Sequence, residues 1–233
     1  MNIVVTGATK GIGRAVADIF AANGFNLAIC SRNESELLQY KAELEARYMD
    51  INVIVRKTDM SVKGEVIAFA EFVKNHWEKI DVLVNNAGVF FPGEIHKEDE
   101  GTLESMINTN LYSAYYLTRT LLPAMLPHKK GHIFNMCSIA SIMAYPNGGS
   151  YSISKFALLG FSKVLRAEMK DKGIRVTSVL PGATWSASWE GVDLPDERLM
   201  KAEDIAKAIW GAYELSGQTV IEELLLRPQL GDL

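Results

Sequence analysis

The chain has 233 residues, of which 48% are hydrophobic, and it carries a net charge of -4 with a pI near 5.7. This length and apolar content predict one α/β domain over residues 1–233 with a large core. The mild acidity gives no electrostatic reason to expect a nucleic-acid or membrane partner, and no apolar run reaches the roughly 18 residues of a spanning helix. Because the N-terminus enters an apolar strand without a basic segment, we expect no signal peptide and a cytoplasmic location.

The cysteines and histidines give no sign of a disulfide or a metal centre. Cys30 and Cys137 each close an apolar, strand-like run, which predicts buried free thiols. The four histidines show no spacing typical of metal ligands, among themselves or with the cysteines, so no metal site is expected. They are His76, His96, His128 and His132.

Short apolar runs alternate with amphipathic stretches along the whole chain, a pattern typical of βαβ units. We predict seven strands and six intervening helices, folded as a doubly wound parallel sheet flanked by helices on both faces. Ligands of such sheets bind at the carboxyl ends of the strands. The predicted strands are Asn2–Thr6, Asn26–Ser31, Ile51–Thr58, Ile80–Asn85, Gly131–Cys137, Ile174–Leu180 and Thr219–Leu226, and the predicted helices cover residues 11–23, 33–49, 61–78, 100–127, 150–172 and 201–214.

A glycine turn follows the first strand and leads directly into the first helix. Its sequence is Thr6-Gly7-Ala8-Thr9-Lys10-Gly11-Ile12-Gly13. Glycines allow a tight bend and let a phosphate approach the backbone, and the helix start offers unpaired N–H groups and its positive dipole end. The spacing is Gly-x3-Gly-x-Gly and not the Gly-x-Gly-x-x-Gly dinucleotide fingerprint, so an ordinary βα turn is the alternative at this point.

The end of the second strand favours a phosphorylated nicotinamide cofactor. An enzyme that uses NAD(H) usually places an acid there to bind the ribose hydroxyls, but this strand meets no acid before Glu34. Ser31, Arg32 and Lys10 instead offer a cationic pocket suited to a 2′-phosphate. These residues predict NADP(H) over NAD(H), and the alternative is that both cations are solvated loop charges.

Polar and small residues also follow the third and fourth strands. Asp59, which precedes Met60 and Ser61, can cap the next helix. The same carboxylate can accept a hydrogen bond from an adenine amine, and the two roles are compatible. Asn86-Ala87-Gly88 can form a simple turn, and these small residues also leave room for a cofactor.

Four residues on later elements form a candidate catalytic group. Ser138 follows the fifth strand, while Tyr151 and Lys155 share one helix face, with Cβ atoms about 5–6 Å apart. A neighbouring ammonium lowers a tyrosine pKa from its ordinary value of about 10, so we expect Lys155 to bring Tyr151 into the range for proton exchange. Asn110 lies inside a predicted helix, where asparagine is unfavourable, so a kink or a held water is expected there. Tyr-x-x-x-Lys alone is also common in packed helices.

Together these motifs resemble the short-chain dehydrogenase/reductase family over essentially the whole chain. The resemblance implies a Rossmann fold and hydride transfer between a nicotinamide cofactor and a carbonyl or alcohol carbon. It implies Tyr151 as the acid/base, Lys155 as a ribose ligand that lowers the tyrosine pKa, and Ser138 as donor to the substrate oxygen. Asn110 is implied to hold a proton-relay water against Lys155. The residues that the motifs and the resemblance assign to the cofactor are Thr6, Gly7, Thr9, Lys10, Gly11, Ile12, Gly13, Ser31, Arg32, Asp59, Met60, Asn86, Ala87, Gly88, Tyr151, Lys155, Pro181, Gly182 and Thr184.

Substrate specificity is expected in three irregular stretches, residues 89–99, 139–150 and 183–200. Their aromatic side chains can line an apolar pocket or form the small core of a lid, and the short last stretch favours a small or open-ended substrate. The segment 220–228 resembles that of 3-hydroxy acid dehydrogenases and 3-oxoacyl-carrier-protein reductases. The aromatic residues are Phe90, Phe91, Tyr145, Trp185 and Trp189.

The same resemblance suggests a homodimer or homotetramer that pairs the helices at 100–127 and 150–172, although their apolar faces can equally pack on the sheet. The expected substrate is a small carbonyl or alcohol compound. A non-catalytic NADPH sensor is the alternative function, but such proteins usually lack the tyrosine or the lysine. An acyl-carrier-protein partner requires a basic patch near the pocket mouth, for which the candidates are Lys129, Lys130, Arg166 and Lys170.

Overall fold

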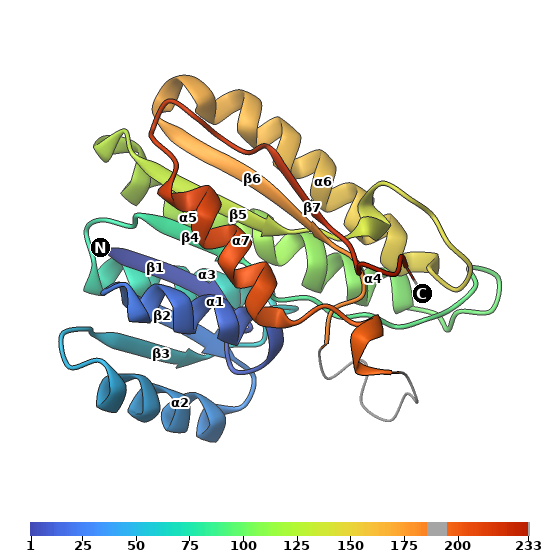
Figure 1. The fold of residues 1–233 in the computed structure, drawn as a ribbon, viewed down its shortest axis with the longest axis horizontal. Coiled ribbons are helices and arrows are strands. Elements are labelled where there is room, and N and C mark those ends of the chain that lie inside the picture. The colour runs from blue at the N-terminus through green and yellow to red at the C-terminus, as the bar shows by residue number, and fades with distance from the viewer. Residues whose placement is uncertain (186–194, 233) are drawn as a thin grey trace.

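The computed structural model describes residues 1–185 and 195–232. They contain a seven-stranded, all-parallel sheet in the order β3-β2-β1-β4-β5-β6-β7 (Figure 1). The order reverses between β1 and β4, which confirms the predicted doubly wound sheet and places a ligand-binding crevice at their carboxyl ends. The strands are β1 (Asn2–Thr6), β2 (Asn26–Ser31), β3 (Val53–Lys57), β4 (Val82–Asn85), β5 (Gly131–Met136), β6 (Ile174–Pro181) and β7 (Glu223–Leu226).

Helices cover both faces of the sheet, as the continuous apolar strands require. Buried side chains of α1, α2 and α7 form one core with the sheet, and those of α3, α5 and α6 form a second core on the opposite face (Figure 1). The first core contains an aromatic cluster in which Phe20 meets Trp210 edge-on, with ring centroids 5.1 Å apart. The long helices are α1 (Gly11–Ala22), α2 (Glu34–Arg47), α3 (Lys63–His76), α5 (Ser113–Met125), α6 (Gly149–Met169) and α7 (Ala202–Glu214).

The predicted helix at 100–127 is interrupted in the structure. It divides into α4 (Thr102–Ile107), a π-helical turn over Asn108–Tyr112, α5, and a 3₁₀ turn over Leu126–His128. Such π-turns are rare and frequently occur at functional sites. Asn110 lies inside this π-turn, so the helix departs from regular α-helical geometry at the asparagine for which a kink or a held water was expected.

The last strand is shorter than predicted because side chains engage the carbonyl groups before it. The Arg175 guanidinium donates to the carbonyl oxygens of Leu215 and Thr219, at 2.9 and 3.4 Å. The Thr177 hydroxyl donates to the Ile221 carbonyl oxygen at 2.6 Å. The segment before β7 is consequently held by β6 side chains as far as Ile221. Backbone pairing with β6 begins at the Glu222 carbonyl oxygen, which accepts from the Ser178 N–H at 2.9 Å, and continues through Glu223–Leu226.

Cys30 and Cys137 are buried free thiols, as predicted. In the part of the chain that the structure describes, no helix is long and apolar enough to cross a membrane. Within the same ranges, no three His, Cys, Asp or Glu residues are grouped so that they could hold a metal ion.

Candidate active site

The glycine turn is held tightly against the carboxyl end of β4. The Thr6 hydroxyl accepts hydrogen bonds from the backbone N–H groups of Asn86 and Ala87, at 3.0 and 2.9 Å. The Asn86 amide donates to the carbonyl oxygens of Thr6 and Gly7, at 2.8 and 3.1 Å. The Asn86-Ala87-Gly88 segment therefore braces the turn, in addition to leaving space beside it.

Glycine is required at two positions of this turn. Gly7 has a φ of +63°, in the left-handed region, and a Cβ on Gly13 would lie 2.3 Å from the Gly7 carbonyl oxygen. The first helical residues follow Lys10, whose side chain makes no capping hydrogen bond to α1. The turn thus presents backbone N–H groups and a helix N-terminus without a side chain in between, which suits a pyrophosphate.

The residues expected to bind a 2′-phosphate lie at the end of β2 and in the glycine turn. The N–H groups of Gly7 and Ala8 donate to the Cys30 carbonyl oxygen at 3.0 and 3.3 Å, so the turn contacts the end of β2. Lys10 and Arg32 are both exposed there, and the Lys10 Nζ lies 3.0 Å from Glu36 Oε1. One of the two cations expected to bind a 2′-phosphate is therefore already paired with an acid.

Asp59 has the capping role expected from its sequence position. Its Oδ1 accepts hydrogen bonds from the backbone N–H and the hydroxyl of Ser61, at 2.9 and 2.7 Å. Partial burial acts to raise the pKa of Asp59, but the Ser61 hydrogen bonds and the charge of Arg32 outweigh it and lower the pKa. Met60 is buried, with its Sδ 3.8 Å from the Cys30 Sγ, so its side chain packs in the core and only its backbone can face a ligand.

Ser138 and Tyr151 meet at the carboxyl end of β5. A hydrogen bond between their side chains lowers the pKa of Tyr151, but desolvation by burial is the larger effect and raises the pKa above its ordinary value. The expected lowering of the Tyr151 pKa by Lys155 is therefore not found in the free protein. The reason is desolvation: Lys155 is buried and Tyr151 is partly buried, and removal from water penalises the charged form of each.

Lys155 is nearly inaccessible and points to the sheet. Its Nζ donates to the Met136 carbonyl oxygen at 2.7 Å and lies 5.7 Å from the centroid of the Tyr151 ring. Burial lowers the pKa of Lys155 to about 8, and this effect outweighs the charge on Cys137, which acts to raise the pKa. The ammonium is thus held by the Met136 backbone carbonyl, a contact that the sequence did not predict.

Asn110 uses its amide to connect three elements. Its Oδ1 accepts from the Val89 N–H at 2.8 Å, and its Nδ2 donates to the Val89 carbonyl oxygen and to the Ser154 hydroxyl, at 3.0 and 2.8 Å. A Cβ on Gly88 would lie 3.2 Å from Asn110 Oδ1 and 3.5 Å from Lys155 Nζ, so these two polar atoms flank Gly88. Asn110 therefore fixes the segment after β4, a structural role beyond the water-holding role that the resemblance implies.

The turn after β6 joins the site to the C-terminal segment. The Gly182 N–H donates to the Leu226 carbonyl oxygen at 2.8 Å, and a Cβ on Gly182 would lie 3.1 Å from Pro228. The Thr184 hydroxyl donates to the Gly182 carbonyl oxygen at 3.0 Å and is buried. Pro181 ends β6, so this turn stands at the same edge of the sheet as Ser138.

The segment between β4 and α4 packs against the N-terminus of α6. The Phe90 ring meets the Tyr151 ring edge-on, with centroids 4.8 Å apart. The Glu98 carboxylate accepts hydrogen bonds from the backbone N–H of Ser150, at 2.8 Å, and from its hydroxyl. A carboxylate at a helix N-terminus is also stabilised by the positive end of the helix dipole. Glu98 therefore anchors the turn that carries Tyr151.

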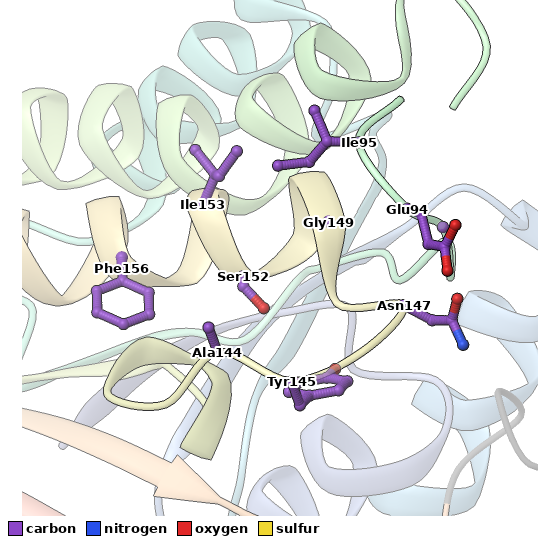
Figure 2. Close-up of a pocket in the computed structure, with 10 residues that line it drawn as sticks. Glu94, Ile95, Ala144, Tyr145, Asn147, Gly149, Ser152, Ile153 and Phe156 are labelled. Carbon is purple, nitrogen blue, oxygen red and sulfur yellow. The ribbon is translucent and has the colours of Figure 1, made fainter. Parts of the chain in front are cut away.

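A cavity of about 500 Å³ lies between this segment and α6 (Figure 2). Figure 2 shows that Ser152, Ile153 and Phe156 of α6 border it, together with Tyr145 of the preceding loop. At 100° per residue, Ile153 and Phe156 lie about 160° and 140° around the helix from Tyr151, and Ser152 lies about 100° from it. Two of the expected specificity stretches therefore line a cavity, but not one that Tyr151 enters. Trp189, from the third stretch, lies outside the described residues.

The basic residues considered for a carrier-protein patch are at the wrong edge of the sheet. Lys129 and Lys130 precede β5, and Arg166 and Lys170 lie at the end of α6, before β6. Because α6 begins near Tyr151 and rises 1.5 Å per residue, Lys170 lies about 28 Å from Tyr151. Arg166 is moreover paired with Glu222, at 3.0 Å. The expectation of a basic patch near the pocket mouth is wrong for these four residues.

Several residues of the site were not found from the sequence. Ser154 and Val89 hold Asn110, Glu98 holds the start of α6, and the Met136 carbonyl oxygen holds Lys155. Only Ser154 carries a usable signal, because it lies beside Lys155 on the helix that bears Tyr151. The other contacts join segments far apart in the sequence.

Fold and site together are those of a dinucleotide-binding α/β enzyme, with a glycine turn at the switch point of the sheet and a tyrosine–lysine pair at the same edge. A family model described as short chain dehydrogenase matches residues 1–194. The chain belongs to the short-chain dehydrogenase/reductase family and is an oxidoreductase, which confirms the resemblance seen in the sequence.

Known relatives match nearly the whole chain. A sepiapterin reductase from Chlorobaculum tepidum is 34% identical over 239 residues, covering 99% of this chain and 97% of the relative. An NADP-dependent 3-hydroxy acid dehydrogenase, YdfG, from Salmonella typhi is 31% identical and covers 98% and 95% of the two chains. The crystal structure of an alcohol dehydrogenase from the archaeon Thermococcus sibiricus, complexed with 5-hydroxy-NADP, superposes with a TM-score of 0.90 at 27% identity, over 98% of this chain and 96% of that one.

Proposed function

We propose that the protein is an NADP(H)-dependent reductase of small carbonyl compounds, with Tyr151 as the group that exchanges the proton. The observation that carries the proposal is the contact between Tyr151 and Ser138 beside the buried Lys155, at the carboxyl edge of the sheet. Two neighbouring hydroxyls can both donate to a carbonyl oxygen and stabilise the negative charge that develops on it.

The glycine turn, the Asn86 segment and the cationic pair support the choice of cofactor. The turn excludes side chains where a pyrophosphate would approach, and Lys10 and Arg32 suit a 2′-phosphate. The Salmonella relative is an NADP-dependent enzyme and the Thermococcus enzyme binds 5-hydroxy-NADP in its crystal structure, which agrees with this choice. When bound, the nicotinamide supplies the hydride that reduces the carbonyl carbon.

The protein supplies the proton and the charge stabilisation. Because burial raises the pKa of Tyr151, its hydroxyl is protonated at neutral pH and is ready to donate to an alkoxide. The phenolate left behind lies near the Lys155 ammonium, which stabilises it and thereby favours the transfer. Asn110 keeps the segment after β4 in place and so acts as a positioning residue.

The test is NADPH oxidation by wild type and by Tyr151→Phe against a panel of carbonyl compounds. The panel holds short 3-oxoacyl thioesters, 3-oxo acids, diketones, aldehydes and sugars, with NADH in parallel. We expect turnover of one class with NADPH preferred, and a loss of about 10²–10⁴-fold in Tyr151→Phe with NADPH affinity unchanged. The exposed Tyr112→Phe is the matched control and keeps full turnover. Unchanged turnover in Tyr151→Phe refutes the assignment.

The same panel decides between the alternatives. Tight NADPH binding by the wild type without turnover of any compound favours the sensor function. Turnover confined to 3-oxoacyl thioesters favours a 3-oxoacyl reductase, although the misplaced basic residues weaken the case for a carrier-protein partner.

We also infer a homo-oligomer in the cytoplasm. Large apolar side chains on α4, the π-turn and α6 are exposed, among them Leu103, Tyr112, Ile153, Phe156 and Val164. A monomer rarely leaves such a surface uncovered, and a second copy of the same helices would cover it. Buried free thiols agree with a reducing compartment. Light scattering of the purified chain measures the oligomer directly, and a monomer at micromolar concentration refutes it.

A further inference from the structure

Lys10, one of the two cations expected to bind the cofactor's 2′-phosphate, is paired with an acid. Lys10 lies in the glycine turn, and its Nζ is 3.0 Å from Glu36 Oε1 on α2. Lys10 is largely exposed, with 67% of its side chain accessible, so the pair lies at the open rim of the pocket. The contact joins the glycine turn to the first turn of α2, which follows the end of β2.

Glu36 is held in place by the start of its own helix. Asn33 caps α2, and its side-chain oxygen accepts hydrogen bonds from the Glu36 backbone N–H, at 3.3 Å, and from the Ser35 hydroxyl, at 2.8 Å. Glu36 is consequently the third residue of the first helical turn, where the dipole favours a carboxylate. Its negative charge is thus a fixed feature of the pocket, one turn beyond Arg32.

A phosphate monoester at the ribose carries about -1.5 to -2 charges at neutral pH. To bind Lys10 it has to displace the Glu36 carboxylate or share the ammonium with it, and in both cases it meets a like charge. A cofactor without the 2′-phosphate does not meet this competition. The effect of Glu36 is therefore specific to the phosphorylated cofactor.

We propose that Glu36 is a specificity-determining residue that weakens binding of 2′-phosphorylated nucleotides by competing for Lys10. The proposal rests on the NADP(H) preference argued above and adds a residue that acts against it. An exposed ion pair contributes little, so we expect Glu36→Gln to bind the phosphorylated nucleotide about threefold to fivefold more tightly. Binding of the unphosphorylated nucleotide is expected to stay constant.

The experiment is calorimetric titration with adenosine 2′,5′-bisphosphate and with 5′-AMP, which report the 2′-phosphate without any turnover. Glu34→Gln is the matched control, because it removes the same charge from the same helical turn, two residues away and exposed. In a Lys10→Gln background, Glu36→Gln is expected to give no gain, since the ammonium for which it competes is gone.

The outcomes separate this proposal from the cofactor preference. A gain for the bisphosphate alone, in Glu36→Gln and not in Glu34→Gln, supports the proposal. Equal gains in both variants indicate a general charge effect and overturn it, and weaker binding in Glu36→Gln overturns it by showing that Glu36 orients Lys10. No change in Glu36→Gln, with a wild type that prefers the bisphosphate, refutes the proposal alone. A wild type that binds both nucleotides equally refutes the cofactor preference and the proposal with it.

Discussion

His132 is expected to make the fold sensitive to acid. It lies on β5, fully buried, with its ring stacked on Phe134 at 3.9 Å between centroids and its Nε2 2.7 Å from the Thr177 hydroxyl. That hydroxyl already donates its proton to the Ile221 carbonyl oxygen, so Nε2 must be the donor and Nδ1 carries the free lone pair. Within the described residues, Nδ1 has no partner.

Protonation of His132 would bury a charge and an unpaired N–H. Burial, assisted by the charge of Arg175, lowers the pKa of His132 well below its ordinary value of 6.5. The folded state therefore binds fewer protons than the unfolded state below pH 6.5, and stability is lost as the pH falls. One proton taken up on unfolding corresponds to about 1.4 kcal/mol of unfolding free energy per pH unit.

The assay is urea unfolding of wild type and His132→Asn at intervals from pH 7.5 to 5. The difference between their unfolding free energies should change by about 1.4 kcal/mol per unit below pH 6 and be constant above pH 7. Phe134→Leu is the control, because it removes the stacked ring and keeps His132, so its stability should fall by a similar amount at every pH. Parallel curves for wild type and His132→Asn would refute the argument.

Two further substitutions test the site. Glu98→Ala removes the acceptor of both Ser150 hydrogen bonds. It should cost about 1–3 kcal/mol of stability and lower kcat more than NADPH affinity. Glu100→Ala, at an exposed acid two residues away, should change neither, and equal losses in the two variants would contradict the anchoring role. Gly13→Ala places a methyl group against the Gly7 carbonyl oxygen and should abolish cofactor binding in fluorescence titration. The control is Gly64→Ala in α3, where an added Cβ meets no other atom, and it should stabilise the fold by about 0.5–1 kcal/mol.

The misplaced basic residues show where sequence reasoning fails. The distance of Lys129 and Arg166 from Tyr151 depends on the direction in which α6 runs. This helix begins at the carboxyl edge of the sheet, near Tyr151, and ends at the opposite edge, near Arg166. A cluster of basic residues in the sequence does not show at which edge of the sheet those residues lie. Only the topology places these residues at the amino edge of β5 and β6.

Short-range patterns in the sequence were enough to predict the fold class and most of the site motifs of this protein. Apolar runs and helical periods predicted seven parallel strands, and the glycine turn, Ser138 and the Tyr151–Lys155 pair were identified because each is a short-range pattern. Two residues four apart on a helix share a face in any fold that keeps the helix. The same holds for a glycine turn between a strand and a helix.

The tertiary structure determined the burial, the pKa values and the hydrogen-bond and ion-pair partners of those residues. The pKa of Tyr151 rises instead of falling because the folded chain buries it, and burial is the sum of contacts from distant segments. Likewise Glu98 meets Ser150 across 52 positions, and Glu36 meets Lys10 across the end of β2. Charges and hydrogen bonds act over a few ångströms in space, and only the fold sets which residues lie within that distance.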